Sequence, residues 1–216
     1  MSAQLALDLI QPLEPSLDNF VPGANAEVLA ALRAVANGTG PSFVYLWGTS
    51  GSGRSHLLRA LNATSGGLTA EVPEFAPDRS VFVVDDVDRL NDESQRRLFV
   101  LANEVRAMPG ATLLAAGPVP PAQLILREDL RTRLAWGLVY QLHPLSDTDK
   151  AHALDHHAAS RGIALSPEVV SYLLTHVPRD MRTLVAILDA LDAHALVKQR
   201  AITVPLVREW LARGDT

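Results

Sequence analysis

A glycine-rich segment followed by a cation and a hydroxyl has the spacing of a phosphate-binding loop. The pattern G-x-x-x-x-G-K-[ST] needs glycines where the backbone bends toward a polyphosphate, a cation for the β- and γ-phosphates, and a hydroxyl for Mg²⁺. Gly48, Gly53 and Ser55 fit, whereas Arg54 replaces the lysine. An ordinary Gly/Ser turn is the alternative. We expect nucleotide binding by these residues: Gly48, Thr49, Ser50, Gly51, Ser52, Gly53, Arg54, Ser55 and His56.

Two neighbouring aspartates provide a second set of phosphate-site residues. The apolar run 81–84 predicts a buried strand that ends at Asp85 and Asp86. In phosphate-binding-loop proteins a carboxylate at this position holds Mg²⁺, so Ser55 and Asp85 are predicted to bind the metal with the nucleotide. Asp86 occupies the position that polarises the attacking water, although its side chain is shorter than the usual glutamate. Helix N-capping without a ligand is the alternative for both carboxylates.

Two positions needed for hydrolysis depart from the expected chemistry. The apolar run 111–116 ends at Gly117 and Pro118, where an AAA+ ATPase needs a polar side chain directed at the γ-phosphate. Arg54 adds a bulkier and more rigid group than an ammonium. Because phosphoryl transfer depends on positioning and electrostatics, we infer that the chain binds nucleotide and hydrolyses it poorly. Lys150 and Lys198 are the only lysines, so a general drift from Lys to Arg also explains Arg54.

Two further arginines and a histidine pair could have a function, or could be surface residues without one. Arg133 could act as an arginine finger on a nucleotide bound by a neighbouring subunit, or could form a surface salt bridge with Glu128 or Asp129. Arg182 begins a predicted helix and could reach phosphates, although a salt bridge explains it better. His152 and His156 share a helical face without a third ligand, which favours a solvated helix over a metal site.

The pattern of elements predicts an α/β domain followed by helices. Continuous apolar runs that alternate with helices indicate a parallel sheet covered on both faces. The predicted strands are 43–47, 81–84, 111–116 and 138–142. A helix over 28–35 precedes them, and the helices between them are 55–61, 91–108 and a short helix near Arg133. After Pro144 only helices are predicted, over 147–160, 167–177, 179–199 and 205–212. We expect an extended tail over 1–18, an α/β domain over 19–146 and a small helical lid over 147–216.

Composition limits the classes of protein to which the chain can belong. Its 216 residues can bury a sizeable core, and 48% hydrophobic with 20% charged residues is typical of a globular protein. The sequence contains no membrane-length apolar run, no signal peptide and no cysteine, which favours the cytoplasm. A net charge of -5 argues against sequence-specific DNA binding through a broad basic surface.

Several stretches together resemble the DnaA/Hda branch of AAA+ proteins, and within it the Hda homologues that inactivate the replication initiator DnaA. Residues 20–25 look like the adenine-side box, and residues 45–58 are similar to the Hda phosphate loop, arginine included. Residues 133–137 resemble the arginine-finger box, and residues 142–147 and 181–184 resemble the domain boundary and the sensor-2 helix. The resemblance implies an AAA+ fold with a helical lid, bound ADP or ATP with Mg²⁺, and a nucleotide contact from Arg182.

The tail acquires a role from the same resemblance. Gln4, Leu5, Leu7 and Leu9 match the Q-L-x-L-x-L peptide that docks on the DNA polymerase III sliding clamp, although a leucine-rich tail also arises by chance. An extended segment can insert its carboxamide and apolar anchors into a groove. The chain also ends before the DNA-reading domain of DnaA, in agreement with its acidic charge.

The resemblance implies a regulator without strong ATPase activity of its own. The clamp would recruit the chain, and Arg133 would complete the ATP site of DnaA and leave the initiator inactive. A stand-alone ATPase of the helicase-loader type and a non-catalytic clamp adaptor remain alternatives, and a homodimer is left open. The short, proline-containing interval 65–80 departs from the family, because a strand-helix unit expected there is missing or reduced.

Overall fold

The computed structural model describes residues 14–62 and 72–213, which fall into two compact units. The first extends from Pro15 to Pro144 and contains the sheet, and the second begins at Leu145 and contains helices. The predicted fold class, a parallel α/β unit followed by a helical unit, is confirmed.

Four parallel strands form the sheet in the order β2-β3-β1-β4. The strands are β1 (Phe43–Trp47), β2 (Val81–Val84), β3 (Thr112–Gly117) and β4 (Leu138–Gln141). β1 is paired on both sides, and its last residue lies opposite the last residues of β3 and β4. The carboxyl ends of the strands therefore lie at one edge of the sheet.

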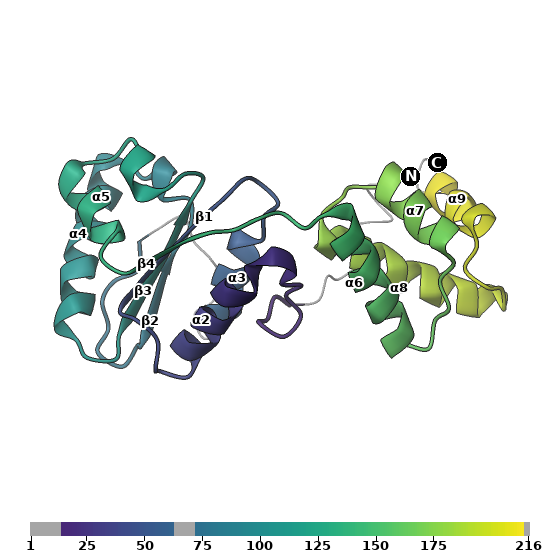
Figure 1. Cartoon of the computed structure of the whole chain (residues 1–216), viewed down its shortest axis with the longest axis horizontal. Helices are drawn as coiled ribbons and strands as arrows, with labels where there is room; N and C mark the ends of the chain where they lie inside the picture. Colours follow the sequence, from purple (N-terminus) through teal and green to yellow (C-terminus); the bar gives the residue numbers. More distant parts are fainter. Residues whose placement is uncertain (1–13, 63–71, 214–216) are drawn as a thin grey trace. The chain divides into compact units, whose positions relative to one another are not determined.

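Helices cover both faces of this sheet (Figure 1). The helices α2 (Ala26–Ala36) and α3 (Arg54–Leu61) pack on one face, and α4 (Asp92–Ala107) and α5 (Glu128–Leu134) pack on the other. This double cover explains why the inner strands are continuous apolar runs without alternation. The remaining elements of the unit are three short 3-10 helices: η1 (Gly23–Asn25), η2 (Val87–Arg89) and η3 (Pro121–Gln123).

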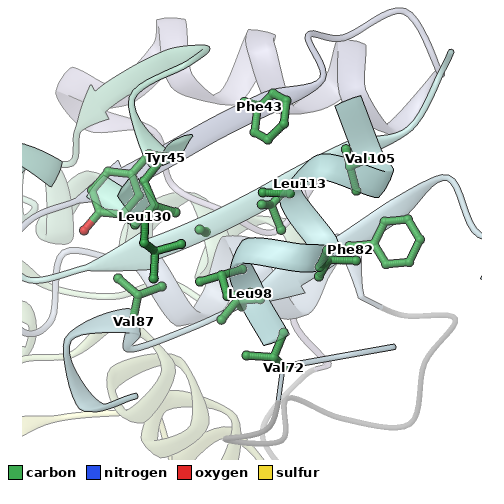
Figure 2. Close-up of a cluster of buried hydrophobic side chains, with 14 of the residues drawn as sticks. Phe43, Tyr45, Val72, Phe82, Val87, Leu98, Val105, Leu113 and Leu130 are labelled. Atoms are coloured by element: carbon green, nitrogen blue, oxygen red, sulfur yellow. The ribbon is translucent and has the colours of Figure 1, made fainter. Parts of the chain in front are cut away.

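The core on the α4/α5 side is the larger of the two in this unit (Figure 2). Phe82, Leu98 and Leu130 are fully buried and belong to a strand, α4 and α5 respectively. Val72 contributes to the same cluster from the segment that precedes β2. Within the described part of the interval, residues 72–80 form no helix or strand, and β2 is the edge strand of the described sheet.

The second unit consists of four helices around their own apolar core. They are α6 (Asp147–Ser160), α7 (Pro167–His176), α8 (Met181–Lys198) and α9 (Val204–Arg213). Ser146 and Asp149 form a capping box at the start of α6, and the side chain of Asp180 caps α8. These caps fix the helix starts; α8 therefore begins two residues later than the predicted 179 because Asp180 serves as its N-cap. In the described part of the chain, no helix has both the length and the apolar character that crossing a bilayer requires.

A buried asparagine connects the beginning and the end of the α/β unit by hydrogen bonds. Asn25 is 2% exposed, and its Nδ2 donates to the carbonyl of His143 at 2.8 Å. In return, its Oδ1 accepts from the His143 N–H at 2.8 Å. The amide thus ties the start of α2 to the chain that leaves β4, and both backbone groups depend on it.

Replacing Asn25 should cost much more stability than replacing an exposed asparagine. We expect Asn25→Ala to lower the free energy of unfolding by about 2 kcal/mol, because buried backbone groups at His143 lose their partner. Asn37, which is exposed at the end of α2, is the control. Asn37→Ala should change the free energy of unfolding by less than about 0.5 kcal/mol. Urea denaturation followed by circular dichroism measures both; equal losses would show that the Asn25 bonds are dispensable.

Candidate functional site

The loop between β1 and α3 has backbone geometry that depends on glycine. Gly51 and Gly53 have φ of 78° and 96°, a left-handed region that side chains rarely adopt. At Gly48 a Cβ would lie 2.5 Å from the carbonyl oxygen of Leu142 and 2.9 Å from Ser52 Oγ. The three glycines therefore permit a tight loop that leads directly into the N-terminus of α3.

Two polar groups in the loop are buried and lack hydrogen-bond partners among the described residues. They are Ser52 Oγ, in a residue that is 5% exposed, and Arg54 Nη1, on a side chain that is 13% exposed. Buried donors without partners are unfavourable unless a ligand satisfies them. Together with the backbone N–H groups in the first turn of α3, which has no side-chain cap, these donors form a cradle suited to a polyphosphate.

The strand that carries the aspartates brings Asp85 to the start of α3. Ser55 Oγ donates to Asp85 Oδ2 at 2.6 Å, and the N–H of Asp86 donates to Asp85 Oδ1 at 2.9 Å. A hydroxyl and a carboxylate at this separation provide oxygen ligands of the kind that Mg²⁺ prefers. The residues present therefore fit the predicted metal, which Ser55 and Asp85 would hold.

Asp86 is engaged by two arginines. Its Oδ1 lies 4.0 Å from Arg54 Nη2, and its Oδ2 lies 3.6 Å from Arg89 Nη1. The residue also has a left-handed backbone, with φ of 45°. Its carboxylate is therefore shared between two guanidinium groups.

The end of β3 has no space for the polar side chain that hydrolysis needs. A Cβ at Gly117 would lie 2.3 Å from the hydroxyl oxygen of Tyr45. That hydroxyl donates to the carbonyl of Val119 at 2.9 Å. Burial, followed by the nearby Asp88, raises the pKa of Tyr45, so the phenol remains a protonated donor. The sequence showed that residue 117 lacks a side chain, but not that Tyr45 fills its place.

The segment before α2 lies against the start of α3. The ring of Phe20 lies 5.5 Å from that of His56, and His56 Nε2 is 2.9 Å from the carbonyl oxygen of Ser16. A Cβ on Gly53 would be 2.7 Å from the Phe20 ring. The predicted adenine-side segment and the phosphate loop are therefore neighbours, and the His56 ring contacts that segment.

Arg133 lies on α5 and is held by neutral groups. Its Nε donates to Asn103 Oδ1 at 3.2 Å, and its Nη1 donates to the Asp129 carbonyl at 3.0 Å. The guanidinium carbon lies 3.6 Å from the centroid of the Phe99 ring. The alternative salt bridge to Glu128 or Asp129 is not formed among the described residues, because the Asp129 carboxylate pairs with Arg127. Arg133 remains partly exposed, and it forms no ion pair within 4.0 Å among the described residues, while its charge contributes, after the hydrogen bond from Arg127, to lowering the pKa of Asp129.

The structure brings together some of the predicted residues and leaves others unplaced. The loop residues lie beside Asp85 and Asp86, whereas Arg133 lies on α5 of the same unit. Arg182 is exposed in the first turn of α8 in the helical unit. Gln4, Leu5, Leu7 and Leu9 lie outside the described residues. Sequence reasoning missed Phe99 and Asn103 as partners of Arg133, because α4 carries no local signal that links it to α5.

Comparison with known proteins identifies the helical unit and the fold. Residues 147–211 match the family model described as Hda, lid domain. Domain III of DnaA from Thermotoga maritima is similar to the chain with a TM-score of 0.68 and 18% identity, covering 96% of this chain and 99% of that domain.

Two other solved structures share the fold. AMPPCP-bound DnaA from Aquifex aeolicus is similar with a TM-score of 0.65 and 18% identity, over 87% of this chain and 67% of that one. A RuvB variant from Thermotoga maritima is similar with a TM-score of 0.62 and 16% identity, over 90% of this chain and 70% of that one. These likenesses show that the chain shares the fold of these DnaA and RuvB structures.

The ion pair between Arg127 and Asp129 affects the pKa of the Asp129 carboxyl group, and substitution of Arg127 should change that pKa. The hydrogen-bonded Arg127 guanidinium holds the pKa of Asp129 below its ordinary value, and the Leu130 N–H also contributes. Arg127→Ala should therefore raise the pKa of Asp129 toward that ordinary value. A carboxyl NMR titration measures this shift.

The sign of the accompanying pH effect follows from the direction of the shift. A depressed carboxyl pKa contributes stability at neutral pH that is lost as the pH falls through the folded-state pKa. Any difference in stability between wild type and Arg127→Ala should thus disappear in acid. Arg96→Ala is the control, because Arg96 pairs with Glu93. An unchanged Asp129 pKa in Arg127→Ala would show that the pair does not form in solution.

Proposed function

We propose that this chain, whose residues 147–211 match the Hda lid-domain model and whose fold is similar to that of DnaA domain III, is a nucleotide-binding AAA+ regulator of replication initiation. It docks on the DNA-loaded sliding clamp in the cytoplasm and stimulates hydrolysis of the ATP that is bound to DnaA. The observation that carries this proposal is Arg133, a partly exposed guanidinium whose hydrogen-bond partners among the described residues are a side-chain amide and a backbone carbonyl.

The loop between β1 and α3 is the proposed nucleotide site. Ser52 Oγ and Arg54 Nη1 are buried and have no hydrogen-bond partner in the part of the chain that the structure describes, as expected for groups that bind phosphate oxygens. The DnaA of Aquifex aeolicus, which shares the fold, is bound to AMPPCP, an adenine nucleotide analogue. ADP or ATP is the proposed ligand, with Mg²⁺ held by Ser55 and Asp85. The metal would supply positive charge that neutralises the phosphates.

The chain is proposed to be a poor ATPase by itself. The candidate base, Asp86, is paired with Arg54 and Arg89, and the Gly117 position has no side chain to orient water. Phosphoryl transfer relies on such positioning because the protein contributes little covalent chemistry. Bound nucleotide then serves to order the protein instead of being turned over.

Arg133 is the group proposed to act in another molecule. An arginine supplied in trans stabilises the charge that develops on the transferred phosphoryl group. To do so, Arg133 must exchange its bonds to Asn103 and Asp129 for bonds to the phosphate. That exchange is favourable because a phosphate offers the guanidinium a negative charge and bidentate geometry, which the uncharged oxygens of Asn103 and the Asp129 carbonyl lack.

Removing the guanidinium should abolish stimulation without affecting the other interactions. We expect Arg133→Ala to bind nucleotide and clamp as wild type does, and to lower the stimulated hydrolysis rate by about 10³-fold. The measurement is single-turnover hydrolysis of DnaA-bound ATP, with and without DNA-loaded clamp. Arg97→Ala, a surface arginine on α4, is the control. Stimulation by Arg133→Ala at the wild-type rate would refute the finger, and a fast ATPase in wild type alone would favour a stand-alone motor.

The tail should determine binding to the clamp. Gln4→Ala combined with Leu7→Ala removes the carboxamide and one apolar anchor of the proposed docking peptide, and we expect clamp affinity to fall by at least about a hundredfold. Surface plasmon resonance on immobilised clamp measures this, with Gln11→Ala as the control outside the motif. Retained affinity in the double variant would dismiss the peptide.

A further inference from the structure

Gln95 is a buried polar residue that connects the end of β2 to the start of α5. It lies on α4 and is 8% exposed. Its Nε2 donates to the carbonyl of Leu90 at 3.1 Å, and its Oε1 accepts from the N–H of Arg127 at 3.3 Å. Both ends of one amide are therefore used, and each end contacts a different segment of the chain.

On one side, Gln95 contacts the segment that begins with the two aspartates. Asp85 bonds Ser55 of the phosphate loop, and Asp86 follows it directly. The backbone then forms η2, in which the N–H of Arg89 donates to the Asp86 carbonyl at 2.9 Å. Leu90 caps this short helix. The carbonyl that Gln95 holds is thus one turn away from the carboxylates at the nucleotide site.

On the other side, Gln95 contacts the first residue before the helix that carries Arg133. The Arg127 guanidinium binds the Asp129 carboxylate through Nε at 3.2 Å and Nη2 at 2.7 Å. The carbonyl of Asp129 in turn accepts from Arg133 Nη1 at 3.0 Å. Hydrogen bonds at Arg127 and Asp129, connected through the covalent structure of these two residues, therefore link Gln95 to the guanidinium of Arg133.

We propose that Gln95 is a positioning residue that transmits the state of the nucleotide site to Arg133. The inference rests on the proposed function for the use of Arg133, but the coupling itself concerns this chain alone. When the nucleotide displaces the segment that contains Asp85 and Asp86, the Leu90 carbonyl moves. Leaving a buried amide or carbonyl without a partner is unfavourable, so the start of α5 follows that movement.

Two substitutions of Gln95 separate this role from simple packing. Gln95→Met keeps the approximate shape and removes both hydrogen bonds. Gln95→Glu keeps the acceptor for the Arg127 N–H but presents a carboxylate, which cannot donate, to the Leu90 carbonyl. Gln141→Met, at an exposed position of β4, is the matched control. All variants are made in the full-length chain.

The first measurement is hydrogen exchange at the backbone amides of α5, with and without ADP and Mg²⁺. We expect ADP to slow exchange over residues 128–134 by at least about fivefold in wild type and in Gln141→Met. In Gln95→Met and Gln95→Glu this slowing should be absent, although ADP still binds with wild-type affinity by calorimetry. A role confined to stability would speed exchange equally in both states and leave the response to ADP intact.

The second measurement is stimulation of DnaA-bound ATP hydrolysis with and without ADP. The rate with ADP should be about tenfold higher than the rate without ADP in wild type, and the two rates should be about equal in both Gln95 variants. If Gln95→Met does not fold, Gln95→Glu provides the same test. The proposal is overturned if ADP does not slow hydrogen exchange in α5 of wild type. It is also overturned if ADP slows that exchange in either folded Gln95 variant. If wild type fails to stimulate DnaA, the proposed function fails, and hydrogen exchange still decides the coupling.

Discussion

Parallel pairing across β2, β3, β1 and β4 places the carboxyl ends of the strands at one edge of the sheet, and the candidate site is built from that edge. The loop after β1 meets the aspartate after β2 through the bond between Ser55 and Asp85. The chain that leaves β4 passes close enough for the Leu142 carbonyl to require glycine at position 48. If the pairing of β1 with either neighbour were lost, these groups would no longer converge.

Two guanidinium groups of the α/β unit differ in how their charge is compensated, and the difference matches their proposed roles. Arg54 is largely buried beside a carboxylate and retains one N–H group without a partner among the described residues, as suits a phosphate held within the same molecule. Arg133 is partly exposed against an aromatic ring, a carbonyl and an amide oxygen. Neutral partners keep the guanidinium oriented while leaving its charge for an external anion.

Local signals in the sequence predicted most of the fold and the centre of the site. Continuous apolar runs predicted the strands, and Asn91 predicted the start of α4, where its side chain accepts from the Ser94 N–H. The glycine spacing likewise predicted a bend of the backbone, and Gly51 and Gly53 form it with left-handed φ values. The contacts of Gln95 and Tyr45 could not be predicted, because they depend on which helices and strands become neighbours. A glutamine on α4 resembles any surface residue until the start of α5 packs against it.

The tyrosine that fills the space beside Gly117 restricts how this protein can change in evolution or design. Because the Tyr45 hydroxyl occupies the volume of any new side chain at residue 117, a single exchange there would force the ring out of the core or distort β3. A hydrolytic group can be acquired only if both positions change together. A side chain at residue 117 alone would therefore disturb the packing around Tyr45 without placing a polar group freely at the end of β3.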